Sequence, residues 1–139
     1  MELFKQLETL SPDLFFDDLG SESSEAIEAV HIPANIIDLT PESFAQALQL
    51  NADNPQDFIT RFLPAERILT RFTGQFYRAD LNEKALQMVQ LMQENLQQHT
   101  LIVLGKDNDE NVDAEHPVYV VGVADDGSLV GFKSKVIWT

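Results

Sequence analysis

The sequence predicts an α+β fold, and three segments of the chain carry that prediction. Residues 118–124 and 129–138 are two largely apolar runs on either side of an Asp-Asp-Gly-Ser sequence. Such a turn between apolar runs is typical of a β-hairpin, because glycine accepts a positive φ. Residues 100–104 form a short apolar run that predicts a buried strand, and residues 80–98 carry apolar side chains at helical spacing. Helices mixed with an antiparallel hairpin are typical of an α+β layer fold.

The N-terminal third of the chain predicts two helices and a strand. Apolar side chains at helical spacing over residues 3–10 predict the first helix. The Ser-Pro-Asp sequence at residues 11–13 is typical of a helix N-cap followed by proline, and it predicts a second helix that ends near residue 19. A polar break at residues 20–24 separates this helix from a short predicted strand over residues 27–32, which a proline ends.

The middle of the chain contains two further helix starts and the longest helix. Thr40 followed by proline predicts a helix as far as about Leu50, and the Asn-Pro-Gln-Asp sequence at residues 54–57 predicts a short one. That short helix is expected to contain Phe58, Ile59, Phe62 and Leu63. The helix over residues 80–98 places five apolar residues on one stripe: Leu81, Ala85, Met88, Met92 and Leu96. We interpret this stripe as core, since methionine fills gaps there more often than it lines a partner groove.

The predicted C-terminal hairpin has two distinct faces. Strand alternation places Val130, Phe132, Val136 and Trp138 on one face, and Lys133 and Lys135 on the other. Residues 106–116 precede the hairpin and are polar and acidic, which predicts a solvated loop. Their carboxylate spacing does not match a calcium-binding loop, because the central glycine and the distal glutamate are missing.

The charge of the chain restricts its possible partners. The 139 residues suit a single domain over residues 1–139, with a net charge of −14 from 23 acidic and 9 basic residues. Such a surface repels nucleic acids and anionic membranes, and it attracts basic proteins and metal ions. Taken alone, however, the charge is better explained as a means of keeping the protein soluble.

The sequence also indicates a compartment. The chain contains no cysteine, which excludes disulfides, thiolate metal sites and a cysteine nucleophile. The cytoplasm is the simplest compartment for a chain without cysteine. Its first residues show no basic region followed by an apolar run, so we expect no signal peptide. No apolar stretch approaches the length of a transmembrane helix. We therefore expect a cytoplasmic protein that does not bind membranes.

No arrangement of residues in the sequence indicates catalysis. His31, His99 and His116 have no metal-ligand spacing, and we interpret each as a structural histidine. Glycine-rich phosphate loops are absent, and no pair of carboxylates is singled out among the acidic residues. We predict that the protein is not an enzyme and has no cofactor or metal of its own. A small hydrolase with an undetected carboxylate pair is the alternative left open.

Three segments of the chain resemble the nuclease A inhibitor family, whose members inhibit a sugar-nonspecific DNA/RNA nuclease. The first contains Leu14-Phe15-Phe16 and, after a few residues, Ser21-Glu22-Ser23. The second is Pro55-Gln56-Asp57-Phe58. The third and most specific is the C-terminal stretch over residues 118–139, which ends in Lys-Val-Ile-Trp-Thr.

The resemblance implies a fold, a partner and a mode of action. The implied fold is a three-layer α/β/α sandwich like that of the pathogenesis-related proteins. The implied partner is a sugar-nonspecific, metal-dependent nuclease, and the inhibitor would place its chain end in the active site. The implied partner-binding residues are Glu22, Asp57, Phe58 and the C-terminal Thr139. The oxygen atoms of Thr139 can approach the metal ion of the target nuclease.

Two positions depart from the family pattern. Phe58 stands where the pattern has tryptophan, so it keeps an aromatic anchor and lacks the indole N–H donor. Trp138, before the terminal threonine, stands where a relative has an acidic residue. An alternative function is a non-enzymatic adaptor module of the same fold with a different protein partner, and co-precipitation of a basic nuclease would separate the two hypotheses.

Overall fold

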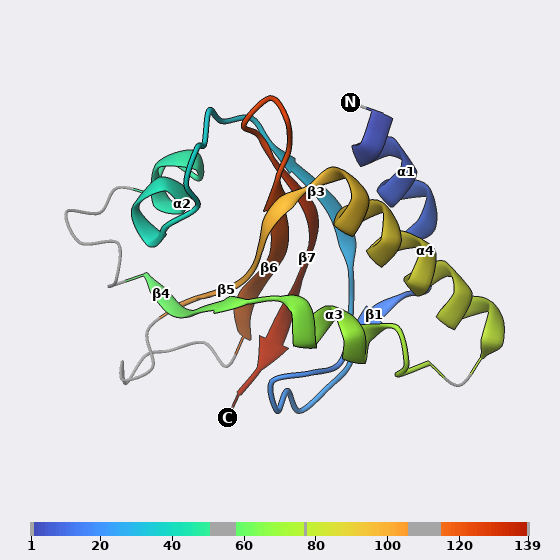
Figure 1. The fold of residues 1–139 in the computed structure, drawn as a ribbon. Helices are drawn as coiled ribbons and strands as arrows, with labels where there is room; N and C mark the ends of the chain where they lie inside the picture. The colour runs from blue at the N-terminus through green and yellow to red at the C-terminus, as the bar shows by residue number, and fades with distance from the viewer. Residues whose placement is uncertain (1, 51–57, 77, 106–114, 139) are drawn as a thin grey trace.

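The computed structural model describes residues 2–50, 58–76, 78–105 and 115–138, which form a mixed α+β fold around one antiparallel sheet (Figure 1). Its five strands lie in the order β3-β7-β6-β5-β4. Their bounds are Glu28–Ile32 for β3, Ile59–Pro64 for β4, Gln97–Leu104 for β5, Glu115–Val123 for β6 and Leu129–Ile137 for β7. Two short strands, β1 (Phe15–Phe16) and β2 (Glu25–Ala26), pair with each other outside this sheet.

The predicted C-terminal hairpin is confirmed as strands β6 and β7, which pair along their whole lengths. Gly127 in the turn has a φ of 86°, the conformation that the Asp-Gly sequence predicts. One carboxylate oxygen of Asp126 accepts hydrogen bonds from the N–H and the hydroxyl of Ser128, at 3.0 and 2.6 Å. These bonds lower the pKa of the Asp126 carboxyl below its ordinary value, so the charged form stabilises the turn.

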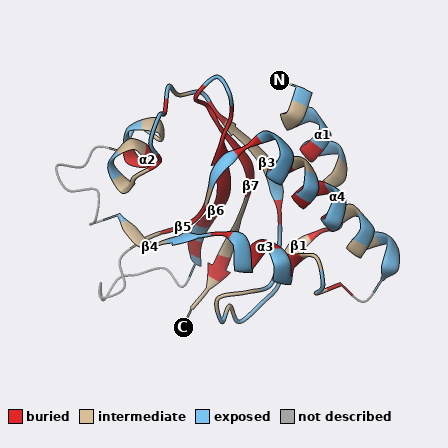
Figure 2. Ribbon diagram, viewed as in Figure 1, coloured by how far each residue is buried: buried red, intermediate tan, exposed pale blue. Residues whose placement is uncertain are grey.

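Three helices cover one face of the sheet: α1 (Glu2–Leu10), α3 (Glu66–Phe72) and α4 (Ala79–Asn95). Their buried residues pack against strands β5, β6 and β7 to form the larger part of the core (Figure 2). Four of the five stripe residues predicted for the longest helix are buried, and the fifth packs against this core: Ala85, Met88, Met92, Leu96 and Leu81. The interpretation of the stripe as core is confirmed.

Helix α2 (Pro41–Ala47) covers part of the opposite face. It begins at the predicted N-cap, where the Thr40 hydroxyl accepts the N–H of Ser43 at 3.1 Å. Phe44 is fully buried and packs edge-on against Tyr119 of β6, with 5.4 Å between ring centroids. The helix is shorter than predicted, because the chain turns through a positive φ at Gln49.

The helix predicted from Ser-Pro-Asp to residue 19 is wrong. Ser11 ends α1 instead, since both its N–H and its hydroxyl donate to the carbonyl of Leu7, at 3.0 and 2.7 Å. Asp13 then adopts a φ of 71°, which no α-helix contains. The next residues form β1, which pairs with β2. Ser11 therefore closes a helix here, because its hydroxyl donates to a helix carbonyl instead of accepting an N–H as it would at an N-cap.

The short helix predicted over Phe58 to Leu63 is also wrong. Residues from Ile59 onward form the edge strand β4, in which Phe62 lies opposite Ile102 and Leu63 opposite Leu101 of β5. Pairing with a buried strand outweighs the local preference of the segment for a helix. Residues 54–57, where that helix was predicted to start, lie outside the described residues, as do residues 106–114 of the predicted acidic loop. None of the helices in the described ranges is both long and apolar enough to cross a membrane.

Candidate functional site

Several chain segments that are far apart in sequence meet at one end of the sheet. Here β4 begins and β5 ends, with Ile59 opposite Leu104, and β6 begins as β7 ends, with Glu115 opposite Ile137. The loop over residues 17–24 lies against the same end (Figure 1). We call this region the Trp138 end of the sheet and define it by the loop over residues 17–24 together with Phe58, Arg61, Gly105, His116 and Trp138.

The loop is bound directly to the last residues of β7. The N–H of Glu22 donates to the carbonyl of Ile137 at 2.9 Å, and the N–H of Ile137 donates to the Ser21 hydroxyl at 2.9 Å. The indole N–H of Trp138 donates to the carbonyl of Leu19, also at 2.9 Å. These three bonds place Glu22, an exposed residue, beside the final residues of the C-terminal strand.

The same loop is also tied to helix α3. The Asp18 carboxylate accepts two hydrogen bonds from the Arg71 guanidinium, at 2.8 and 3.1 Å, and a third from the N–H of Leu19 at 2.7 Å. The hydrogen bond to Asp18 raises the pKa of the Arg71 guanidinium above its ordinary value. The Arg71 side chain is 54% exposed and that of Asp18 15%, so solvent screens this pair and its contribution to stability is small. Its effect is geometric, because a bidentate contact fixes the direction of both side chains.

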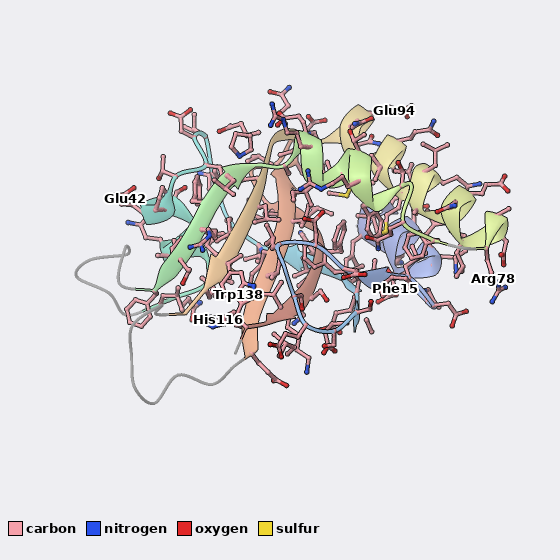
Figure 3. The ribbon with its side chains drawn as sticks, turned by 90° about the horizontal axis from the view of Figure 1, so that it is seen from below. Phe15, Glu42, Arg78, Glu94, His116 and Trp138 are labelled. Carbon is pink, nitrogen blue, oxygen red and sulfur yellow. The ribbon has the colours of Figure 1, made fainter. Side chains whose placement is uncertain are left out.

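Trp138 contacts a histidine ring and an arginine. Its ring centroid is 5.0 Å from that of the buried His116 (Figure 3). The guanidinium carbon of Arg61 lies 5.2 Å from the centroid of the same indole. The Arg61 position is suited to a cation–π contact. A nitrogen of the His116 ring is 3.1 Å from the carbonyl oxygen of Leu104, which fixes the ring at the end of β5. His116 is thus a structural histidine in the described part of the chain.

Gly105 connects this aromatic cluster to Phe58. Its φ is 123°, and a Cβ at this position would lie 2.4 Å from Nδ1 of His116, so only glycine fits. The N–H of Gly105 donates to the carbonyl of Phe58 at 2.9 Å, and its carbonyl accepts the hydroxyl of Thr60. A continuous set of contacts therefore runs from Phe58 through Gly105, His116 and Trp138 to the loop that carries Glu22.

The two predicted site residues that the structure describes lie at the same end of the sheet, with Glu22 beside β7 and Phe58 directly before β4. Glu22 is exposed, and the Phe58 side chain is 38% exposed, so a partner can reach both. Asp57 and Thr139 lie outside the described residues, each next in sequence to a member of the Trp138 end. Arg61 and Gly105 were not predicted as site residues. A glycine directly after a buried strand was the available signal for Gly105.

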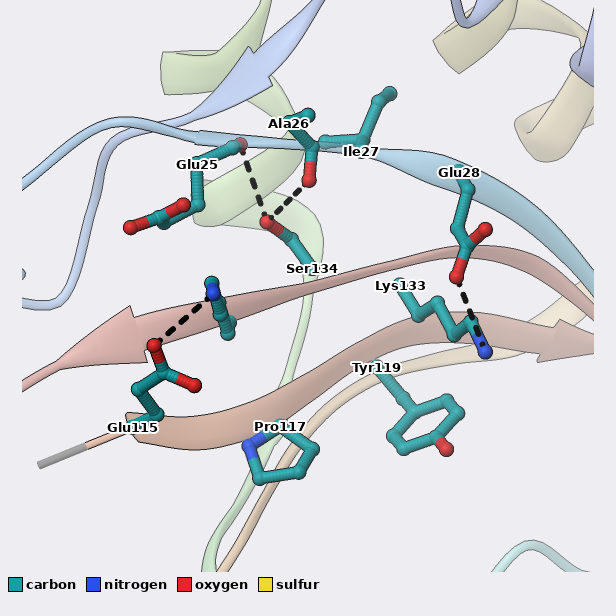
Figure 4. Close-up of a pocket in the computed structure, with 10 residues that line it drawn as sticks. Glu25, Ala26, Ile27, Glu28, Glu115, Pro117, Tyr119, Lys133 and Ser134 are labelled. Atoms are coloured by element: carbon teal, nitrogen blue, oxygen red, sulfur yellow. Dashed lines mark hydrogen bonds and ion pairs between the residues drawn. The ribbon is translucent and has the colours of Figure 1, made fainter. Parts of the chain in front are cut away.

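A separate groove of about 800 Å³ lies on the sheet face that carries Tyr119 (Figure 4). Lys133 pairs with Glu28 and Lys135 with Glu115, each at 3.1 Å, and the second contact raises the pKa of Lys135. Because each lysine is paired with a glutamate, the groove has no excess of positive charge that would select an anion. Across the described ranges, no group of three histidine, cysteine, aspartate or glutamate residues is placed to hold a metal ion.

The described chain is thus an acidic α+β protein in which an exposed carboxylate and an exposed aromatic ring lie at one end of a sheet. The model of the nuclease A inhibitor-like protein family, NuiA, matches residues 1–139, and the chain belongs to this family. Family membership supports an inhibitory role toward a nuclease in general. A comparison with curated proteins finds no match.

Proposed function

We propose that this protein inhibits a sugar-nonspecific, metal-dependent DNA/RNA nuclease by occupying its active site with the Trp138 end of the sheet. One observation carries the proposal: the N–H of Glu22 is bonded to Ile137, so two segments of the family resemblance that are distant in sequence lie side by side. Glu22, Asp57, Phe58 and Thr139 are the proposed contact residues. The proposed mode is reversible occlusion, without chemistry or a cofactor.

Electrostatics supports the choice of partner. A nuclease active site must attract phosphate, so it has positive potential and commonly a hard divalent cation. A protein of net charge −14 is steered toward such a site and is repelled by the nucleic acid itself. Binding to the enzyme rather than to DNA, RNA or a membrane, in the cytoplasm, is therefore part of the proposal. We also propose that the complete fold is a three-layer α/β/α sandwich like that of the pathogenesis-related proteins.

The chemistry of the chain end supports the choice of contact. In a chain that ends at Thr139, this residue carries a hydroxyl and a terminal carboxylate. Both are hard oxygen donors, which can approach Mg²⁺ or a water molecule bound to it. A carboxylate also carries the negative charge that a substrate phosphate would bring to the same place. The terminal group thus takes the position of the substrate without containing a bond that the enzyme can cleave.

Replacing Glu22 by glutamine tests the proposal. Glu22→Gln keeps the shape of the side chain and the backbone bond to Ile137, and it removes one charge. We expect roughly 10- to 100-fold weaker inhibition, because a charge-assisted contact in an interface contributes about 1.5–3 kcal/mol. The measurement is titration of the protein against a purified sugar-nonspecific, Mg²⁺-dependent nuclease that digests DNA.

Glu94→Gln is the matched control, since Glu94 is exposed near the end of α4 and lies far from Trp138 in Figure 3. It removes the same charge and should leave inhibition unchanged. Equal inhibition by Glu22→Gln and the parent would refute the proposed role of Glu22. If the parent inhibits no such nuclease and co-precipitates another protein instead, the adaptor alternative replaces the inhibitor proposal.

Replacing Phe58 tests the aromatic contact. Phe58→Ala removes a ring that is already 38% exposed and keeps the carbonyl that accepts the Gly105 N–H. We expect a loss of about 1–3 kcal/mol in binding if the ring is an interface anchor, and a smaller change in thermal stability. Leu63→Ala is the control, because Leu63 lies in β4, the strand that begins directly after Phe58, and is 42% exposed. A lower melting temperature with unchanged affinity would show that Phe58 serves the fold alone.

A further inference from the structure

We propose that Trp138 is a positioning residue, which holds the Glu22 loop and the end of β7 as one preformed unit before the nuclease arrives. The proposal rests on the function proposed above. It concerns a residue that departs from the family pattern, and it assigns no contact between Trp138 and the nuclease. The basis is the set of bonds that the indole makes within the protein.

The loop needs such a support because its backbone conformation is unusual. Leu19 and Gly20 have φ values of 59° and 72°, and only the glycine adopts this conformation without cost. The carbonyl of Leu19 accepts the Trp138 indole N–H at 2.9 Å. The indole thereby stabilises Leu19, the residue of this turn whose side chain disfavours a positive φ.

The indole itself has little freedom to move. It is partly buried, His116 lies against it at 5.0 Å, and Arg61 lies over the ring at 5.2 Å. Its donor is therefore fixed in direction before a partner binds. A loop that is already ordered loses less conformational entropy on binding, and this preorganisation increases affinity without any new contact to the partner. Phenylalanine at position 138 would keep an aromatic ring beside His116 and Arg61 and would lack the donor.

The purely structural alternative is that Trp138 only fills space beside the main core. The two roles predict different results for Trp138→Phe. Under the positioning role, the Glu22 amide, which is bonded to Ile137, exchanges its hydrogen about tenfold faster in the free protein. Inhibition of the DNA-digesting, Mg²⁺-dependent nuclease weakens by a similar factor while the melting temperature changes little. Under the space-filling role, the Glu22 amide exchanges faster and inhibition weakens only if the melting temperature also falls.

The control is Tyr119→Phe, which also removes one polar hydrogen from an aromatic side chain and lies on the opposite face of the sheet. It should change neither the Glu22 exchange rate nor inhibition. Ser21→Ala provides a second variant if Trp138→Phe does not fold. It removes the acceptor of the Ile137 N–H, leaves Trp138 in place, and should also speed exchange at Glu22. Because the chain contains a single tryptophan, its indole N–H gives one resonance that reports directly on the bond to Leu19.

The outcomes separate this inference from the proposed function. If the parent protein inhibits and Trp138→Phe inhibits equally well, the positioning role is overturned while the inhibitor function stands. If the parent does not inhibit, the proposed function fails, and the exchange data decide the positioning role alone. Unchanged exchange at Glu22 in Trp138→Phe overturns it in either case, and faster exchange there, with unchanged exchange in the core strands, supports it.

Discussion

A chain extended by a few residues after Thr139 is expected to inhibit the nuclease at least about 30-fold less well than a chain that ends there. This factor corresponds to the loss of one interface hot spot of about 2 kcal/mol. The physical reason is that the extension removes the carboxylate from Thr139 and adds volume where the partner must approach. Every side chain of the parent protein stays in place, so the change tests the chain end and nothing else.

The measurement is titration of both chains against the same nuclease, with thermal unfolding measured in parallel. Deleting Thr139 alone should weaken inhibition as well, since it removes the hydroxyl and places the carboxylate on the preceding residue. The melting temperature should stay the same in both, because Val136, the last fully buried residue of β7, lies before the changed positions. An extended chain that inhibits as well as the parent would show that the chain end is not in the active site.

Gly131→Ala is expected to have the largest effect on stability, more than about 4 kcal/mol or a complete loss of folding. Gly131 lies in β7, an inner strand of the sheet, opposite Val121 of β6. A Cβ there would lie 2.0 Å from the carbonyl oxygen of Val120 and 2.8 Å from the Cα of Val121. Both atoms belong to the backbone of a paired strand, so neither can move without breaking the hairpin.

Gly74→Ala is the control for this change. A Cβ at Gly74 meets only the carbonyl oxygen of Arg71, at 4.0 Å, and the residue follows α3 in a turn. Its replacement should shift stability by less than about 1 kcal/mol, in either direction. Chemical denaturation of both variants gives the comparison. A stable Gly131→Ala protein would mean that the two strands can separate at this point without loss of the core.

The hairpin and the longest helix were predictable because local chemistry decides them. An Asp-Gly turn between apolar runs specifies its own register, and Asp126 and Ser128 close it within a few residues. The stripe of α4 is a repeat that only a helix can bury on one side. The N-cap at Thr40 likewise depends only on its nearest neighbours. In the turn and at the N-cap the interacting groups lie within a few residues of each other, and in the helix the pattern itself repeats at that spacing.

The two wrong helices show where local chemistry is not sufficient. Ser11 has the same hydrogen-bonding groups at the end of a helix as at the start of one, so its sequence context alone does not give the direction. Residues 59–64 become a strand because β5 offers a buried partner, which is distant in sequence. Pairing and burial of that kind are properties of the assembled sheet.

What the sequence by itself determined was the acidic character, the α+β class, the C-terminal hairpin and the resemblance that carried Glu22, Asp57, Phe58 and Thr139. What only the tertiary structure decided was that Glu22 and Phe58 belong to one end of the sheet. Three residues connect them: Gly105, His116 and Trp138. Only glycine fits at position 105, because a Cβ there would collide with the His116 ring. The physical reason is that antiparallel pairing places the start of one strand beside the end of its neighbour, even when the two are far apart in the chain.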